Sequence, residues 1–172
     1  DSIDWIIRVD GHTDDTPLSG VGEFKDNLRH GSGTNYWADG MVYDGTWKNG
    51  LIAGFGSTTW PDGKKYVGEY KDGKKEGLGS LEFPNYGQHL GSYSNDKRNG
   101  MGLFIWNDGK VEYCSYANDS ETNCSGTNAQ NVFPVLRNKF IKLDKSSRQL
   151  IQQILTMDGI YNSTIDGVWG KN

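Results

Sequence analysis

A repeated stretch constrains the fold of this chain more than any other feature. Segment 43–56 reads YDGTWKNGLIAGFG and segment 66–79 reads YVGEYKDGKKEGLG, a shift of 23 residues. The same interval aligns three columns of glycine and one of aromatic residues: Gly22, Gly45, Gly68 and Gly91; Gly31, Gly54, Gly77 and Gly100; Gly33, Gly56, Gly79 and Gly102; and Phe24, Trp47, Tyr70, Tyr93 and Tyr116. Because these registers persist without an insertion, the chain is a repeat array built from one structural module.

Each unit predicts a β-hairpin. Tyr66, Gly68 and Tyr70 are spaced by two residues and therefore share one face of a strand. The pair Asp72-Gly73 follows and is typical of a tight turn with positive φ, after which the chain returns antiparallel. A single hairpin buries little surface, so the units are expected to stack into an elongated sheet.

The recurring glycines require an explanation, because glycine inside a strand weakens a sheet. We expect aromatic rings of the same face to lie flat over them, including over Gly68 and Gly77. The rings assigned to this repeat face are Phe24, Tyr43, Trp47, Tyr66, Tyr70 and Tyr93.

The unit, aromatic-x-Gly-x-aromatic-x-Asp/Asn-Gly and then Gly-x-Gly, resembles the MORN repeat over about residues 20–125. The fold class that follows is mainly β: one elongated antiparallel sheet of consecutive hairpins over residues 22–116, without helix between Tyr43 and Gly102. About four and a half units would occupy residues 20–117. A hydrophobic content of 34% with 24 glycines suits such a sheet better than a globular core. Towards the C-terminus the pattern degrades, since Asn95-Asp96 replaces the Asp-Gly turn.

Residues 1–19 contain the segment IDWIIRVDGHTDDTP, which resembles a strand and loop of the OmpA-like peptidoglycan-binding domain. That resemblance implies that Asp14 contacts the diaminopimelate of a stem peptide, together with an arginine on a following helix. The helix is missing, because the sequence passes directly into the repeats. The alternative is a strand that only caps the first hairpin.

Cys114 and Cys124 fall on opposite arms of the fifth unit. If that hairpin persists, they are placed for a cross-strand disulfide, which would favour an oxidising compartment. The alternative is a pair of reduced cysteines in the cytosol. No metal site is predicted, because two cysteines cannot complete four zinc ligands and His30 and His89 belong to distant units.

The composition changes at Asn118, and residues 118–131 are interpreted as a linker. Residues 132–172 follow as a helical module with two short amphipathic helices. Their apolar positions are Val132, Leu136, Phe140 and Leu143, and then Leu150, Ile151, Ile154 and Leu155. Segment 151–170, IQQILTMDGIYNSTIDGVWG, resembles the first half of the small three-helix peptidoglycan-binding domain, with Ser163 where glycine is usual.

Catalysis is not expected. The Gly-x-Gly strings recur on strands and none opens a helix in the manner of a phosphate loop, and no nucleophile stands at a recognisable elbow. We therefore predict a non-enzymatic protein without a cofactor. The net charge of −4 argues against a nucleic-acid partner, and no apolar run is long enough for a transmembrane segment.

Two functions remain. The first is a scaffold or binding protein of a bacterial cell envelope, periplasmic or outer-membrane associated, whose ends contact peptidoglycan while the repeats dock an envelope protein or act as a spacer. The cytoplasm stays open as a location. The second is a scaffold that docks a partner protein or an anionic lipid surface through its sheet. Basic residues that favour it are Lys64, Lys65, Lys71, Lys74, Lys75, Lys97 and Arg98, and acidic neighbours that offset them are Asp62, Glu69, Asp72, Glu76 and Asp96.

Overall fold

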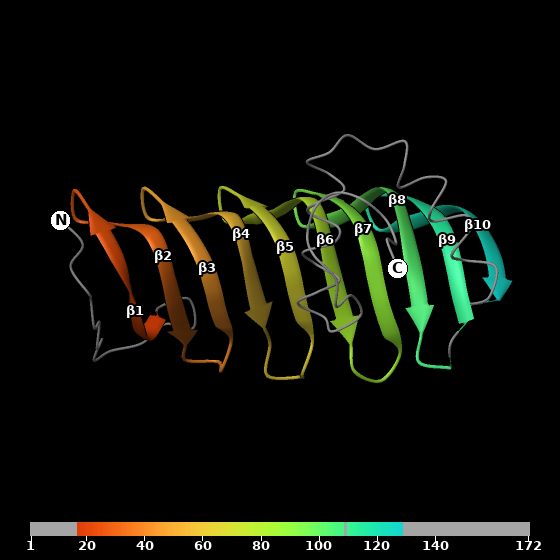
Figure 1. Cartoon of the computed structure of the whole chain (residues 1–172), viewed down its shortest axis with the longest axis horizontal. Helices are drawn as coiled ribbons and strands as arrows, with labels where there is room; N and C mark the ends of the chain where they lie inside the picture. Colours follow the sequence, from red (N-terminus) through yellow and green to blue (C-terminus); the bar gives the residue numbers. More distant parts are fainter. Residues whose placement is uncertain (1–16, 109, 129–172) are drawn as a thin grey trace, which may run out of the picture.

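The computed structural model describes residues 17–108 and 110–128, which form one open sheet of ten antiparallel strands (Figure 1). The strands are β1 (Pro17–Lys25), β2 (Leu28–Trp37), β3 (Val42–Lys48), β4 (Leu51–Thr59), β5 (Lys65–Lys71), β6 (Lys74–Phe83), β7 (Gly87–Ser94), β8 (Lys97–Trp106), β9 (Lys110–Ala117) and β10 (Ser120–Asn128). Each strand pairs only with its neighbours in the chain, and the strands stand side by side along the long axis of the molecule (Figure 1). The predicted single antiparallel sheet of hairpins is confirmed, and no helix occurs in these residues.

The sheet is longer than the sequence indicated, because β10 occupies most of the segment interpreted as a linker. That interpretation was wrong for Ser120–Asn128. The turn before β10, Asn118-Asp119, has φ values of 51° and 71°, the left-handed geometry that suits a two-residue hairpin loop. Polar composition was mistaken for a linker where the chain makes an exposed edge strand. The predicted helices of the C-terminal module and the N-terminal OmpA-like segment lie outside the described residues.

Five tight turns lie along one edge of the sheet, which we call the tight-turn edge (Figure 1). They are Asp26-Asn27, Asn49-Gly50, Asp72-Gly73, Asn95-Asp96 and Asn118-Asp119, and all ten residues have positive φ. Longer connections at the opposite edge join each hairpin to the next. Asp and Asn tolerate the left-handed region better than other side chains, so the loss of the turn glycine in the fourth unit does not disturb the hairpin.

One glycine column serves a purpose different from the one predicted. Gly77 has a φ of +69°, and a Cβ at this position would meet the carboxylate of Glu69 at 2.5 Å. The pairing of β5 with β6 shifts between Gly68 and Tyr70, so Gly77 lies in a β-bulge opposite that shift. The expectation that a ring covers Gly77 was wrong: a backbone conformation, repeated at Gly31, Gly54 and Gly100, requires glycine there.

Glycines of the other two columns do lie under rings in the second, third and fourth units. A Cβ on Gly68 would come within 2.5 Å of the hydroxyl of Tyr66, and the same ring extends over Gly79 on the next strand. Tyr43 covers Gly45 and Gly56 in the same way one unit earlier. Both tyrosines are fully buried although the described sheet has one layer, because each ring lies flat on bare backbone and is enclosed by its neighbours. This packing of rings on glycines is the core of the fold.

Candidate functional site

The predicted repeat-face aromatics form a continuous ladder. Tyr43 meets Trp47 and Tyr70 edge-on, with ring centroids 5.3 and 5.4 Å apart. Tyr66 meets Tyr70 and Tyr93 at 5.2 and 5.1 Å in the same geometry. These five side chains are 0–7% exposed. Phe24 holds the equivalent position on β1, where it pairs with Arg29 and is half-buried. The ladder is therefore structural, and its rings are too enclosed to form a recognition surface.

Basic side chains pack against the aromatic rings of the ladder. The guanidinium of Arg29 lies 4.3 Å from the ring centroid of Trp47, and that of Arg98 lies 4.5 Å from Tyr116. Lys75 places its Nζ within 6.0 Å of the ring centroids of Trp60, Tyr66 and Tyr93, where burial lowers the pKa of the amine. Lys75 and Arg98 were counted in the basic cluster of the sequence, but both contact the sheet itself.

Each tight turn after the first is bound to the unit before it. The amide of Gly50 donates to the carbonyl of Arg29 at 2.8 Å, and the amide of Gly73 donates to Ile52 at 2.9 Å. Asp96 and Asp119 repeat this contact with Lys75 and Arg98 at 3.1 and 2.9 Å. We call these four bonds the inter-unit clamps. They hold successive turns in line along the edge.

The two aspartates add a second bond that glycine cannot make. One carboxylate oxygen of Asp96 accepts from the amide of Lys75 at 2.9 Å. Asp119 accepts from the amide of Arg98 at 2.9 Å and also pairs with the Arg98 side chain at 3.2 Å. Hydrogen bonds and the Arg98 charge hold the pKa of Asp119 below its usual range against the opposing effect of burial. The unit that seemed degraded in the sequence is thus more firmly clamped.

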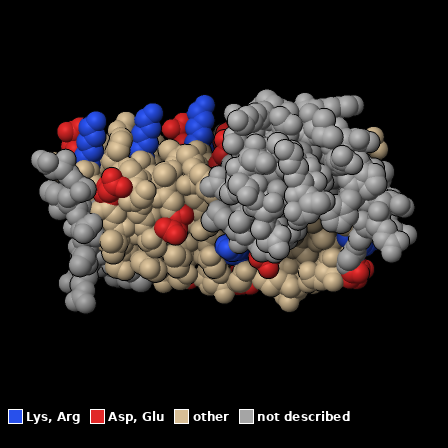
Figure 2. All heavy atoms as spheres, in the orientation of Figure 1, with Lys and Arg blue, Asp and Glu red and all other residues tan. Residues whose placement is uncertain are grey.

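The tight-turn edge carries a row of exposed lysines. Lys25, Lys48 and Lys71 recur every 23 residues at the ends of β1, β3 and β5, and Lys74 and Lys97 begin β6 and β8. Figure 2 shows basic side chains standing out along this edge in the half that remains in view. Two large apolar side chains accompany them, Leu28 at 46% and Leu51 at 50% exposed. We call these seven residues the lysine-leucine edge.

Two of the acidic residues that offset the basic cluster in the sequence lie away from the tight-turn edge. Glu69 accepts a bond from the amide of Leu78 inside the bulge, whereas Glu76 accepts one from the amide of Asn95, in the fourth tight turn, and so stays at this edge. Asp62 lies at the opposite edge of the sheet, paired with Lys64 at 2.9 Å. Asp26, Asp72 and Asp96 stay at the tight-turn edge, with side chains shorter than the lysines around them.

Several of these residues were missed by the sequence reasoning. The signal for Lys25, Lys48, Leu28 and Leu51 was their own 23-residue spacing, which a search centred on glycine and aromatic columns passes over. His89 was missed as a ladder member because it stands one period after Tyr66 but is not a tyrosine. It is fully buried, lies over Gly102 and contacts Tyr116 edge-on at 4.9 Å.

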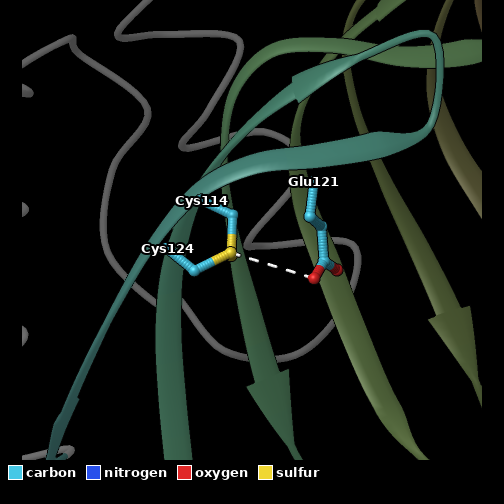
Figure 3. A group of neighbouring side chains, drawn as sticks. All are labelled: Cys114, Glu121 and Cys124. Carbon is cyan, nitrogen blue, oxygen red and sulfur yellow. Dashed lines mark hydrogen bonds between the residues drawn. A yellow bond between two sulfur atoms is a disulfide. The ribbon is translucent and has the colours of Figure 1, made fainter.

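The two cysteines lie where the sequence placed them. Cys114 and Cys124 face each other across β9 and β10, with Cα atoms 4.2 Å apart, and form a disulfide (Figure 3). Glu121 approaches this pair, with one carboxylate oxygen 3.8 Å from the sulfur of Cys124. The three groups lie within 4.8 Å of one another, close enough for a metal ion, but a disulfide offers no thiolate. The group is a covalent staple at the end of the array.

Asp14, the residue assigned to peptidoglycan, lies outside the described residues. In the part of the chain that is described, nothing helical has the length and hydrophobicity that crossing a bilayer requires. A comparison with curated proteins found no match. The family model described as MORN repeat matches residues 21–42, 43–65, 66–88 and 89–111, a continuous stretch that covers just over half of the chain. Its four units coincide with the first four hairpins and their connections, so the chain belongs to the MORN-repeat family.

Proposed function

We propose that this protein is a non-catalytic scaffold of a bacterial cell envelope that docks onto an anionic membrane surface through its lysine-leucine edge. MORN repeats suggest a binding or scaffold role in general. The observation that supports the membrane partner is the row of exposed lysines with two exposed leucines between them, at one edge of a rigid sheet.

The chemistry of this edge suits lipid headgroups. A lysine near an anionic leaflet contributes roughly 1 kcal/mol, so five lysines would supply several kcal/mol before the acidic neighbours are counted. Long lysine stems let the ammonium groups reach phosphates while Leu28 and Leu51 lie at the level of the acyl boundary. Regular hairpin spacing keeps the charges in one line, which a flexible basic tail cannot do. Because the attraction is between lysine charges and lipid phosphates, binding should depend strongly on salt.

The groups with shifted pKa values lie where catalysis has no room. Among described residues, the strongest pKa shifts belong to ladder members, where burial raises the pKa of Tyr66 and Tyr93 and lowers that of His89. Each of these rings is packed against the sheet, where a substrate has no access. Burial in the ladder is the largest cause of each shift.

Vesicle flotation tests the proposal. The full chain should float with phosphatidylglycerol vesicles and remain unbound with phosphatidylcholine vesicles, and about 0.5 M salt should release it, since the Debye length is then only a few ångströms. Lys48→Glu with Lys71→Glu should reduce flotation about tenfold or more, because each reversal replaces an attraction by a repulsion. Lys64→Glu with Lys65→Glu, at the opposite edge, is the matched control with the same change of net charge and should leave binding unchanged. Equal loss in both variants would show that net charge, and not this edge, controls binding.

A second candidate function follows from the resemblance at the two ends. The ends would bind peptidoglycan, with Asp14 accepting a charge-assisted hydrogen bond from a stem-peptide ammonium group. Without the partner arginine we expect millimolar affinity at best, on the order of 4 kcal/mol. Co-sedimentation of the full chain with sacculi, compared with Asp14→Ala, measures this contribution. Unchanged sedimentation of the variant would remove Asp14 from the proposal.

A further inference from the structure

The sheet face opposite the aromatic ladder changes character along the array. In the second unit this face carries Asp44 and Thr59, which are exposed on the interior strands β3 and β4. In later units the column of Asp44 continues as Val67, Leu90 and Tyr113, and the column of Thr59 continues as Glu82 and Ile105. A face that meets only solvent has no need of buried apolar side chains, so the apolar residues that are buried in the later units point to a neighbour on this face.

Apolar side chains and one serine, Ser80, form a continuous strip across five strands. Register pairs join Val67 to Ser80, Ser80 to Leu90, Leu90 to Leu103 and Leu103 to Tyr113, from β5 to β9. Val67 is 1% exposed, Ser80 2% and Leu103 7%. Val111 follows at 4%, with Ile105 and Tyr113 packed against this cluster. We call these residues the apolar strip.

The N-terminal end of the same face is open by comparison. Val21 stands two periods before Val67 in the same column and is 53% exposed, against 1% for Val67. Tyr36 stands three periods before Ile105 and is 44% exposed. The repeat by itself therefore does not bury the side chains on this face. The aromatic ladder cannot cover them either, because the ladder lies on the other face of the sheet.

We propose that the C-terminal segment 132–155 packs along the apolar strip as the second layer of the fold. Strand β10 ends at Asn128, which pairs with Lys110, and Thr127 pairs with Val111, so the chain leaves the sheet directly beside the strip. Forty-four residues follow, 129–172, which is ample to cross five strands. They contain apolar positions at helical spacing that an isolated segment would expose: Leu136, Phe140, Leu143, Leu150, Ile151, Ile154 and Leu155.

The consequence concerns what the segment does. With its apolar face on the sheet, it completes a β/α sandwich over the later units and is not an independent wall-binding module. The strip residues are then a core and not a docking surface for another protein. A second copy of this chain on the same strip is the competing arrangement, and it would leave the segment uncovered.

Limited trypsin digestion of the full chain tests this packing. The segment offers five cleavage sites, Arg137, Lys139, Lys142, Lys145 and Arg148. Ile154→Asp and Val67→Asp should each accelerate cleavage at these sites by at least about tenfold, because cleavage follows the population of the detached segment. Val21→Asp is the matched control on the same face and should not accelerate it. Ile154→Asp keeps the test valid if Val67→Asp fails to fold, since it leaves the sheet unaltered.

Two results would overturn the proposal. The first is cleavage of the parent at the rate of the Ile154→Asp variant, which would mean that the segment is not held. The second is a dimer that sedimentation detects and that dissociates on dilution. If trypsin cuts the segment equally fast in the dimer and in the monomer, the strip is covered by a second copy and not by the segment. Methyl contacts in NMR between Val67 or Leu103 and leucine or isoleucine side chains of 132–155 would support the packing directly.

Discussion

Acid should weaken this protein through His89, the one ladder position in its column where histidine replaces tyrosine. The ring is fully buried on β7, and its Nδ1 lies 2.7 Å from the hydroxyl of Tyr93. Its Nε2 has no hydrogen-bond partner among the described residues, so a proton placed there would be buried without compensation. Burial, aided by the charge of Arg98, lowers the pKa of His89 to about 3.

The direction of the pH effect on stability follows from the difference between the pKa values of the folded and unfolded chains. An unfolded chain protonates this histidine near its ordinary pKa of 6.5, whereas the folded chain keeps it neutral to about pH 3. Stability from His89 is therefore complete above pH 6.5 and is lost progressively as the pH falls towards 3. Each pH unit in this window costs up to about 1.4 kcal/mol, or about 2 kcal/mol between pH 7.5 and pH 5. Asp62, Glu112 and Asp119, whose pKa values are lowered, lose their contributions only at lower pH.

Urea unfolding of the parent and of His89→Tyr at pH 7.5 and pH 5 measures the effect. Tyrosine fits the equivalent position in the second and third units, where the hydroxyls of Tyr43 and Tyr66 donate to the carbonyls of Thr46 and Glu69. The variant should match the parent within about 1 kcal/mol at pH 7.5, because one hydrogen bond replaces another. At pH 5 it should be more stable by about 2 kcal/mol. Equal pH dependence in both proteins would refute the assignment to His89.

Three further predictions concern stability and are measured by thermal or urea unfolding. Gly68→Val should cost more than about 1 kcal/mol because its side chain collides with the Tyr66 ring. Gly77→Val should cost as much through its positive φ, so adding Glu69→Ala should restore only part of the lost stability. A melting temperature equal to that of the parent in either glycine variant would contradict this account. Asp96→Gly keeps the turn but should cost about 1 kcal/mol by removing the carboxylate bond to the amide of Lys75, and no loss would mean that this bond is dispensable. Cys124→Ser should cost about 2–3 kcal/mol, and reductant should lower the melting temperature of the parent but not that of the variant. A parent whose melting temperature does not respond to reductant would contradict the disulfide.

Sequence periodicity predicted the parts of this fold that depend on backbone pairing. Repetition of Tyr66-x-Gly68-x-Tyr70 determines strand, face and turn together, so the hairpins, the ring packing and the Cys114–Cys124 pair could all be derived from spacing. The same reasoning failed where one residue type serves two purposes. Gly77 and Gly79 are indistinguishable in the sequence, yet one supplies a positive φ and the other a flat surface.

The candidate site was harder to predict because charge in sequence does not show where a side chain is directed. Lys71 and Lys75 are four residues apart, but the first is exposed at the turn and the second lies over the ladder. A strand reverses direction between them, which a linear count of charges ignores. The acidic residues behave likewise, since Glu69 is held in the bulge while Asp72 remains at the edge.

Coupling between units determines how these features act together. In a repeat array each unit is stabilised mainly by its neighbours, so a local loss is felt first in the adjoining units. His89 contacts Tyr116 of the fifth unit at 4.9 Å, and Asp119 clamps that unit to Arg98. Acid that protonates His89 should therefore loosen the junction of the fourth and fifth hairpins before the lysine-leucine edge of the first three. The disulfide closes the fifth hairpin upon itself but does not bind it to β8, so the end of the array is held by the backbone pairing of β8 with β9 together with the noncovalent contacts of His89 and Asp119.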